Sequence, residues 1–278
     1  MPALNSISPD KLFRLIGTSA SPAIIDVRPD GEGLIPGARR LAADDVAQWA
    51  GTIQRRSAVV VCVKGEEKSA GVAAWLRHEG IDAEVLEGGF NGWTDSDRPV
   101  VNEAVIPPRN AEGRTVWVTR ARPKVDRIAC PWLIRRFVDP EAIFLFVAPS
   151  EVAGVAKRFN ATPFDVEGVF WSHRGELCTF DVMIEEFGLV SIDPLKQLAV
   201  IVRGADTARP EIAPQAAGLL ALSLGLSRMY SDDMEQLEAG MPVYDALYRW
   251  CRDAVDETHD WVSHTPKSRA PRGTDVLG

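Results

Sequence analysis

The stretch Ala58-Val59-Val60-Val61-Cys62-Val63-Lys64-Gly65-Glu66-Glu67-Lys68-Ser69 decides the fold of the first part of the chain. Its β-branched run over 58–63 is typical of a central strand in a parallel sheet that is covered on both faces. A loop follows, and the pattern predicts a helix from Ser69 to Glu79 that Gly80 ends. Functional sites in open parallel sheets lie at the carboxyl ends of the strands, so Cys62 is a candidate nucleophile.

The residues around this stretch repeat the alternation of strand and helix. Apolar runs predict strands over 23–27 and 83–86, and the spacing of apolar residues predicts helices over 9–16 and 44–53. Ser8 is the expected N-cap of the first helix, with Pro9 at its first helical position. Alternating elements of this length predict an α/β domain built on a parallel sheet.

Length and composition limit the class of protein. The 278 residues suffice for two domains, and 46% apolar and 25% charged residues are ordinary for globular chains. A net charge of −8 with a pI near 5.2 argues against nucleic acid as a partner. We expect no membrane segment, because no apolar run approaches about 18 residues. The start shows no signal peptide and the four cysteines are scattered, so we expect free thiols and a cytoplasmic location.

The loop after Cys62 has the features that activate a thiol. Backbone N–H groups over 63–68 and the positive end of the following helix favour a thiolate and bind an anion beside it. Lys64 and Lys68 add positive charge, whereas Glu66 and Glu67 oppose it and are expected to raise the pKa of Cys62. Spacing alone leaves open a second interpretation, in which Cys62 is a buried residue at a strand end with no chemical role.

Several motifs together resemble the successive signatures of rhodanese domains, in the family's order. They are Asp26-Val27-Arg28, Ile35-Pro36-Gly37-Ala38, Cys62-Val63-Lys64-Gly65, Ser69 and Glu87-Gly88-Gly89-Phe90-Asn91-Gly92-Trp93. The resemblance implies that Cys62 takes a sulfane sulfur from a small donor and passes it to a thiol or cyanide-like acceptor, with no cofactor. It also implies that Asp26 and Arg28 support the loop without reacting.

The length of the loop departs from that of the usual sulfurtransferase. Counting from Cys62 to Lys68 gives seven residues, and the usual loop has six. Seven residues are similar to the loops of rhodanese-fold phosphatases and arsenate reductases, which hold larger tetrahedral oxyanions. Those loops normally end in arginine, whose planar fork pairs with two oxygens, whereas Lys68 is a point charge.

A second domain is predicted after a segment rich in breaker residues. We expect a first domain over 1–105, a linker over 106–114, a mostly helical α+β domain over 115–264 and a polar tail over 265–278. The second domain is expected to contain strands over 115–119 and 143–147. Its predicted helices span 131–138, 180–187, 194–204, 211–227 and 234–258.

Two clusters in the second domain carry candidate chemistry. With Pro131 as the first helical position, Cys130 is the expected N-cap, and Arg127, Arg135 and Arg136 are candidates for an anion-binding face. The alternative is a solvated basic face. His173, Cys178, Asp181 and Asp206 are candidate ligands of a divalent metal. Here the alternative is structural, with Cys178 or Thr179 capping a helix and Asp181 in its first turn.

These clusters resemble the C-terminal domain of the chromate resistance protein ChrB family. The resemblance spans residues 115–262 and is strongest over 126–137, 164–181 and 203–207, which include the candidate residues Asp126 and Arg203. It implies a role in chromate resistance or sensing, with chromate as a candidate ligand. The rhodanese-like part stands where full-length regulators of that family carry a DNA-binding region, so we do not expect a transcription factor.

Three functions therefore stand at this point. The first is a sulfurtransferase with Cys62 as nucleophile, and the second is a binding module that senses chromate or another oxyanion. The third is a metal-dependent enzyme in the C-terminal half that uses His173 and nearby carboxylates.

Overall fold

The computed structural model describes residues 5–257. The first domain is a five-stranded sheet in which every pairing is parallel, in the order β1-β5-β4-β2-β3. The strands are β1 (Ser6–Ile7), β2 (Ala23–Asp26), β3 (Ala38–Arg40), β4 (Ser57–Val61) and β5 (Asp82–Leu86). The predicted α/β class is therefore correct, and β4 lies at the centre of the sheet.

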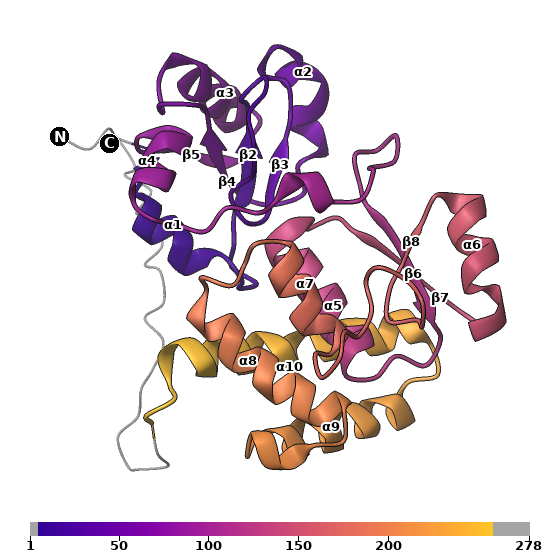
Figure 1. Cartoon of the computed structure of the whole chain (residues 1–278). Coiled ribbons are helices and arrows are strands. Elements are labelled where there is room, and N and C mark those ends of the chain that lie inside the picture. The colour runs from indigo at the N-terminus through magenta and orange to yellow at the C-terminus, as the bar shows by residue number, and fades with distance from the viewer. Residues whose placement is uncertain (1–4, 258–278) are drawn as a thin grey trace, which may run out of the picture.

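Helices cover both faces of this sheet (Figure 1). Val59 and Val61 of β4 share a core with Leu12 of α1 (Pro9–Leu15) and Trp93 of α4 (Gly89–Asp95). Val60, on the opposite face, packs with residues of α3 (Glu67–His78) and with Ala50, which follows α2 (Val46–Trp49). The alternation of side chains along β4 thus puts apolar residues on both faces, as a central strand requires.

The second domain begins as another parallel unit. Strands β6 (Val116–Arg120), β7 (Ile143–Val147) and β8 (Thr162–Pro163) form a sheet in the order β7-β6-β8. Helix α5 (Asp126–Leu133) follows β6, and α6 (Val152–Phe159) follows β7. The rest is helical, as predicted: α7 (Thr179–Glu186), α8 (Asp193–Asp206), α9 (Ala216–Met229) and α10 (Asp233–Asp253). Short 3₁₀ turns fill several connections, such as Glu103–Val105 and Pro210–Ile212.

Three predicted helices differ most clearly from those observed. Helix α5 starts at Asp126, and Pro131 lies inside it, so the prediction that Cys130 is its N-cap was wrong. The helix continues into a single π turn, Ile134–Val138, and π turns of this kind accommodate irregular hydrogen bonding within a helix. The expected helix over 44–53 is a four-residue α-helix between two 3₁₀ turns, and the one expected from 211 starts at Ala216.

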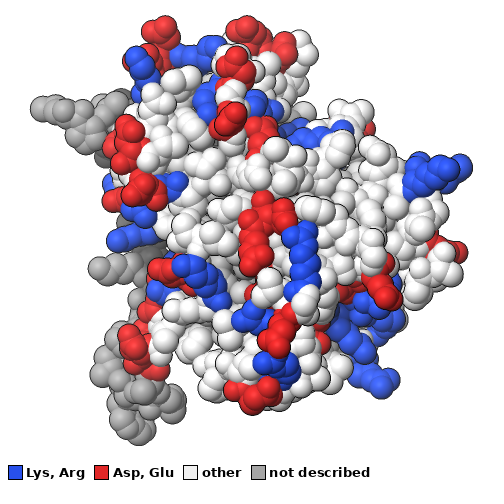
Figure 2. All heavy atoms as spheres, in the orientation of Figure 1, with Lys and Arg blue, Asp and Glu red and all other residues white. Residues whose placement is uncertain are grey.

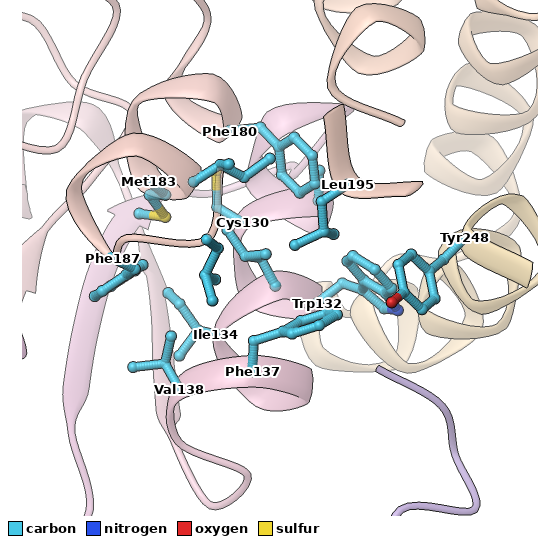
Figure 3. Close-up of a cluster of buried hydrophobic side chains, with 14 of the residues drawn as sticks. Cys130, Trp132, Ile134, Phe137, Val138, Phe180, Met183, Phe187, Leu195 and Tyr248 are labelled. Atoms are coloured by element: carbon cyan, nitrogen blue, oxygen red, sulfur yellow. The ribbon is translucent and has the colours of Figure 1, made fainter. Parts of the chain in front are cut away.

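A continuous apolar core joins the two domains. Figure 3 shows Trp132, Phe137 and Tyr248 packed together, with ring centroids 5.5–5.7 Å apart. The same cluster contains residues of the first domain such as Leu12. Gly17, just after α1, approaches so closely that a Cβ there would lie 2.5 Å from the ring of Phe137 and 2.7 Å from that of Tyr248.

The segment expected to be a linker is held to both domains. Arg109 pairs with Asp139 at 3.0 Å, and Arg39 of β3 donates a hydrogen bond to the carbonyl of Glu112 at 2.8 Å. Arg39 also pairs with Glu141 at 2.7 Å. The connection is therefore an ordered bridge between the domains. The predicted tail over 265–278 lies outside the described residues.

The surface charges, the hydropathy of the helices and the state of the cysteines can each be compared with what the sequence predicted. On the face drawn in Figure 2, acidic and basic side chains are interspersed. Over residues 5–257, no helix is both long and apolar enough to cross a membrane. All four cysteines are free thiols and buried.

Candidate functional site

Cys62 is the first residue after β4, at the carboxyl end of the central strand. Only 6% of the residue is exposed, yet its sulfur is surrounded by donors. The backbone N–H groups of Gly65 and Glu66 donate to Sγ at 3.2 and 3.3 Å, and the hydroxyl of Ser69 lies 3.1 Å from it. The loop therefore curls around the sulfur as the sequence predicted.

These donors outweigh the effect of burial on the thiol. Burial alone raises the pKa of Cys62, because a charged sulfur loses water. The Ser69 hydroxyl and the backbone N–H groups of Glu66, Ser69 and Gly65 lower that pKa, and the net result lies below the ordinary value for cysteine. The expectation that Glu66 and Glu67 raise the pKa was wrong, because Glu66 supplies an N–H donor and both carboxylates point to solvent.

The charged side chains of the loop take no direct part in holding the sulfur. Val63, Lys64 and Lys68 are exposed, and the hydrogen bonds to Sγ come from the backbone and from Ser69. Helix α3 begins at Glu67, two residues earlier than predicted, so Cys62 faces its N-terminal end.

Glycines allow the segment 87–93 to lie directly beneath the loop that follows Cys62. A Cβ on Gly89, which has a φ of 59°, would lie 2.4 Å from the carbonyl oxygen of Cys62. The next residue, Phe90, donates its N–H to that carbonyl at 2.8 Å, and the N–H of Asn91 binds the carbonyl of Val63 at 3.0 Å. Gly65, with a φ of 75°, has similarly little room, since a Cβ there would lie 2.6 Å from the carbonyl of Leu86.

Asp26 and Arg28 form a buried ion pair beside the segment that lies beneath the loop. Two parallel hydrogen bonds join them, at 3.0 and 2.7 Å, and Arg28 also donates to the carbonyl of Gly33 at 2.7 Å. The Arg28 guanidinium lies 3.5 Å from the ring centre of Phe90. The ion pair therefore holds Phe90, whose N–H binds the carbonyl of Cys62. This agrees with the supporting role that was expected for Asp26 and Arg28.

A second polar cluster lies beyond the carboxyl ends of β6 and β8. Asp126 is the first residue of α5, and Asp206 is the last of α8. The Nε2 atom of His173 is 3.2 Å from Asp206 Oδ2, 3.6 Å from Asp126 Oδ2 and 3.5 Å from Asp165 Oδ1. These contacts with carboxylates raise the pKa of His173 to about 10, hydrogen bonding to Asp165 and Asp206 being the largest cause.

Other candidates of the second domain are placed apart from this cluster. Asp181 caps α7 by accepting the N–H of Cys178 at 3.1 Å, and it pairs with Arg203 at 3.4 Å. The structural alternative therefore describes Cys178 and Asp181, and the four expected metal ligands do not come together. Cys130 is fully buried within α5, and burial raises the pKa of its thiol well above the ordinary value.

The three arginines do not form one anion-binding face. Arg135 pairs with Glu238 at 2.6 Å and Arg136 with Asp245 at 2.8 Å, both partners lying on α10. Arg127 points instead to Asp165, at 3.2 Å.

Sequence reasoning missed Asp165 as a site residue. It lies two positions after β8 with a φ of 50°, accepts hydrogen bonds from Thr179 and Arg120, and contacts His173. Its place after a strand was a usable signal, but β8 has only two residues and was not predicted.

Comparison with known sequences assigns both halves of the chain. Residues 8–96 match the rhodanese-like domain, and residues 117–251 match the ChrB C-terminal domain. The chain is thus similar to a rhodanese-like domain followed by a ChrB C-terminal domain. Protein ChrB of Cupriavidus metallidurans is 35% identical over 147 residues, which cover 51% of this chain and 42% of that protein. The chain therefore spans less than half the length of this relative.

Several solved structures are similar to about a third of this chain. A rhodanese-like domain protein from Staphylococcus aureus is 32% identical, with 32% of this chain and 91% of that chain covered and a TM-score of 0.30. A rhodanese homologue from Thermus thermophilus is 29% identical, with 31% and 96% covered and a TM-score of 0.27. A thiosulfate sulfurtransferase from Pseudomonas aeruginosa is 19% identical, with 36% and 20% covered and a TM-score of 0.32.

Proposed function

We propose that this protein is a sulfurtransferase that carries a sulfane sulfur as a persulfide on Cys62. The observation that supports it is the set of donors around Sγ: two backbone N–H groups within 3.3 Å and the Ser69 hydroxyl at 3.1 Å. Such a set stabilises negative charge on sulfur both in the free thiolate and in the persulfide.

The reaction is a double displacement. With thiosulfate as donor, the Cys62 thiolate attacks the outer sulfur, the sulfur–sulfur bond of thiosulfate breaks, and sulfite leaves with the bonding electrons. Cyanide then attacks the outer sulfur of the persulfide, forms thiocyanate and returns Cys62 to the thiolate. No external oxidant is needed, because the donor supplies the sulfur already oxidised.

The direct test is thiocyanate formation together with mass detection of one added sulfur on Cys62. We expect Cys62→Ser to abolish both signals. Cys251→Ser is the matched control, since Cys251 is also a buried free thiol but lies on α10. Wild-type protein that neither gains sulfur from thiosulfate nor forms thiocyanate would refute the proposal for this donor and acceptor.

The second domain suggests a link to chromate. Chromate is a tetrahedral dianion that resembles sulfate and reacts with thiols, and the loop N–H groups at Cys62 are placed to bind an anion. We therefore propose chromate as a ligand of the Cys62 loop. Chromate bound in the loop is expected to slow the alkylation of Cys62. Thiosulfate is expected to compete with chromate for the same loop. An alkylation rate that chromate leaves unchanged would remove chromate as a ligand of this loop.

A further inference from the structure

The cluster at the edge of the second sheet has the composition and spacing of a cation site. Asp126, His173 and Asp206 each offer one ligand atom, and these atoms all lie within 4.8 Å of one another. Ligand atoms about 2.1 Å from a tetrahedral zinc ion are about 3.4 Å apart. The observed 3.2 Å from His173 Nε2 to Asp206 Oδ2 and 3.6 Å to Asp126 Oδ2 are close to that value.

One oxygen in this cluster lacks a partner. Asp126 is fully buried, and its Oδ1 atom has no hydrogen bond. Its other oxygen accepts the N–H groups of Thr179 and Phe180, the first two residues of α7, at 2.6 and 3.3 Å. A buried carboxylate oxygen without a partner is costly, so it calls for a ligand.

The charges around the cluster leave room for a divalent cation. Asp165 is neutralised by Arg120 at 3.1 Å and Arg127 at 3.2 Å. Asp126 and Asp206 have no comparable guanidinium among the ion pairs of the described residues, where each pairs only with His173. The two carboxylates therefore converge on one imidazole nitrogen without an arginine between them.

We propose that Asp126, His173 and Asp206 bind one divalent transition-metal ion. The mixed donor set, one imidazole nitrogen with carboxylate oxygens, suits Zn²⁺ or Mn²⁺ better than Mg²⁺ or Ca²⁺, which prefer all-oxygen sites. The site is open to solvent, since 40% of the His173 side chain and 19% of that of Asp206 are exposed.

Three protein ligands leave a coordination position free for water or an anion. That arrangement is typical of catalytic metal sites, whereas structural sites usually close all four positions with protein groups. The competing explanation is that a protonated His173 serves as the cation of the cluster and that no metal binds.

The test is calorimetric titration of the chelator-treated full chain with Mn²⁺ and with Zn²⁺. We expect one ion per chain, with Mg²⁺ binding more weakly. His173→Gln and Asp206→Asn should each weaken binding at least about tenfold. His78→Gln on α3 and Asp193→Asn at the start of α8 are matched controls that should bind as the wild type does.

A second measurement does not depend on the variants folding. Bound Mn²⁺ is expected to broaden the NMR signals of the His173 imidazole and to leave those of His78 sharp. No stoichiometric binding by wild type, or binding that survives in both ligand variants, would overturn the proposal. Cys62→Ser should bind the metal normally, so the result is independent of the sulfurtransferase proposal.

Discussion

At the scale of single residues, the lowered pKa of Cys62 comes from neighbours within seven positions in the sequence. Ser69 is buried, donates to the carbonyl of Glu66 at 2.9 Å and lies 3.1 Å from Sγ. A hydroxyl has a single hydrogen, so it binds the carbonyl while the thiol is protonated and turns to the sulfur once the proton is lost. Ser69 therefore favours the thiolate.

This argument predicts the pH dependence of alkylation at Cys62. The lowered pKa of Cys62 means that the thiolate becomes the dominant form at a lower pH than it would without these donors. Ser69→Ala removes the hydroxyl and should shift the midpoint of the iodoacetamide rate upward. Ser96→Ala, at an exposed position after α4, should leave it unchanged. Equal midpoints for the wild type and Ser69→Ala would contradict the assigned role of the hydroxyl.

The contacts around Cys62 could be predicted because the residues that make them are close in sequence. The contacts that position the second domain's site could not, because they join residues far apart in sequence. The backbone of Val125, just before α5, has a φ of 21°, which a β-branched residue rarely adopts. Its N–H binds Ser223 and its carbonyl accepts from Tyr244, 98 and 119 residues further along. These contacts place the start of α5 at Asp126, and no local pattern could reveal them.

At the scale of elements, the start of α4 lies directly beneath the Cys62 loop and supports it. Gly88 and Gly89 both have left-handed backbones, so the chain can turn from β5 into α4 directly under the carbonyl of Cys62. The glycines in this motif were readable in the sequence through the family resemblance, but the short strands β1 and β3 were not. Strands of two or three residues exist only through their pairing with β5 and β2.

Gly89→Ala tests the close contact between the start of α4 and the carbonyl of Cys62. The added Cβ would lie 2.4 Å from the Cys62 carbonyl and also meets an unfavourable φ, so we expect a loss of about 2–4 kcal/mol of stability. Sulfur loading of Cys62 should fall with it. Gly71→Ala, inside α3 with open space around its Cβ, should instead stabilise by about 0.5–1 kcal/mol. Denaturant unfolding compares the two, and a Gly89→Ala variant as stable as the wild type would refute the close contact.

At the scale of the whole molecule, the two domains share their core. Apolar residues of α1 and α4 lie in one cluster with those of α5, α7 and α10. The N–H of Gly37 donates to the carbonyl of Phe137 at 2.6 Å, and that of Asn102 donates to the carbonyl of Phe187 at 3.0 Å. Length and composition predicted two domains, but they carry no information on how the domains pack against each other.

We therefore expect one cooperative unfolding transition for the full chain. Gly17→Ala pushes a methyl group into the rings of Phe137 and Tyr248 at a φ of 77°, which should lower stability by about 2–4 kcal/mol. Calorimetry should show the single transition moving down as a unit. Gly218→Ala on α9, where a Cβ meets nothing within 4 Å, is the control. Two transitions, of which only one moves, would show that the domains unfold independently.

The close approach at Gly17 bears on how the protein can be dissected. Truncation at the connecting segment would strip the faces of Phe137 and Tyr248 of their cover and leave them in water. The C-terminal fragment made alone would therefore carry an exposed aromatic surface, which favours aggregation during expression.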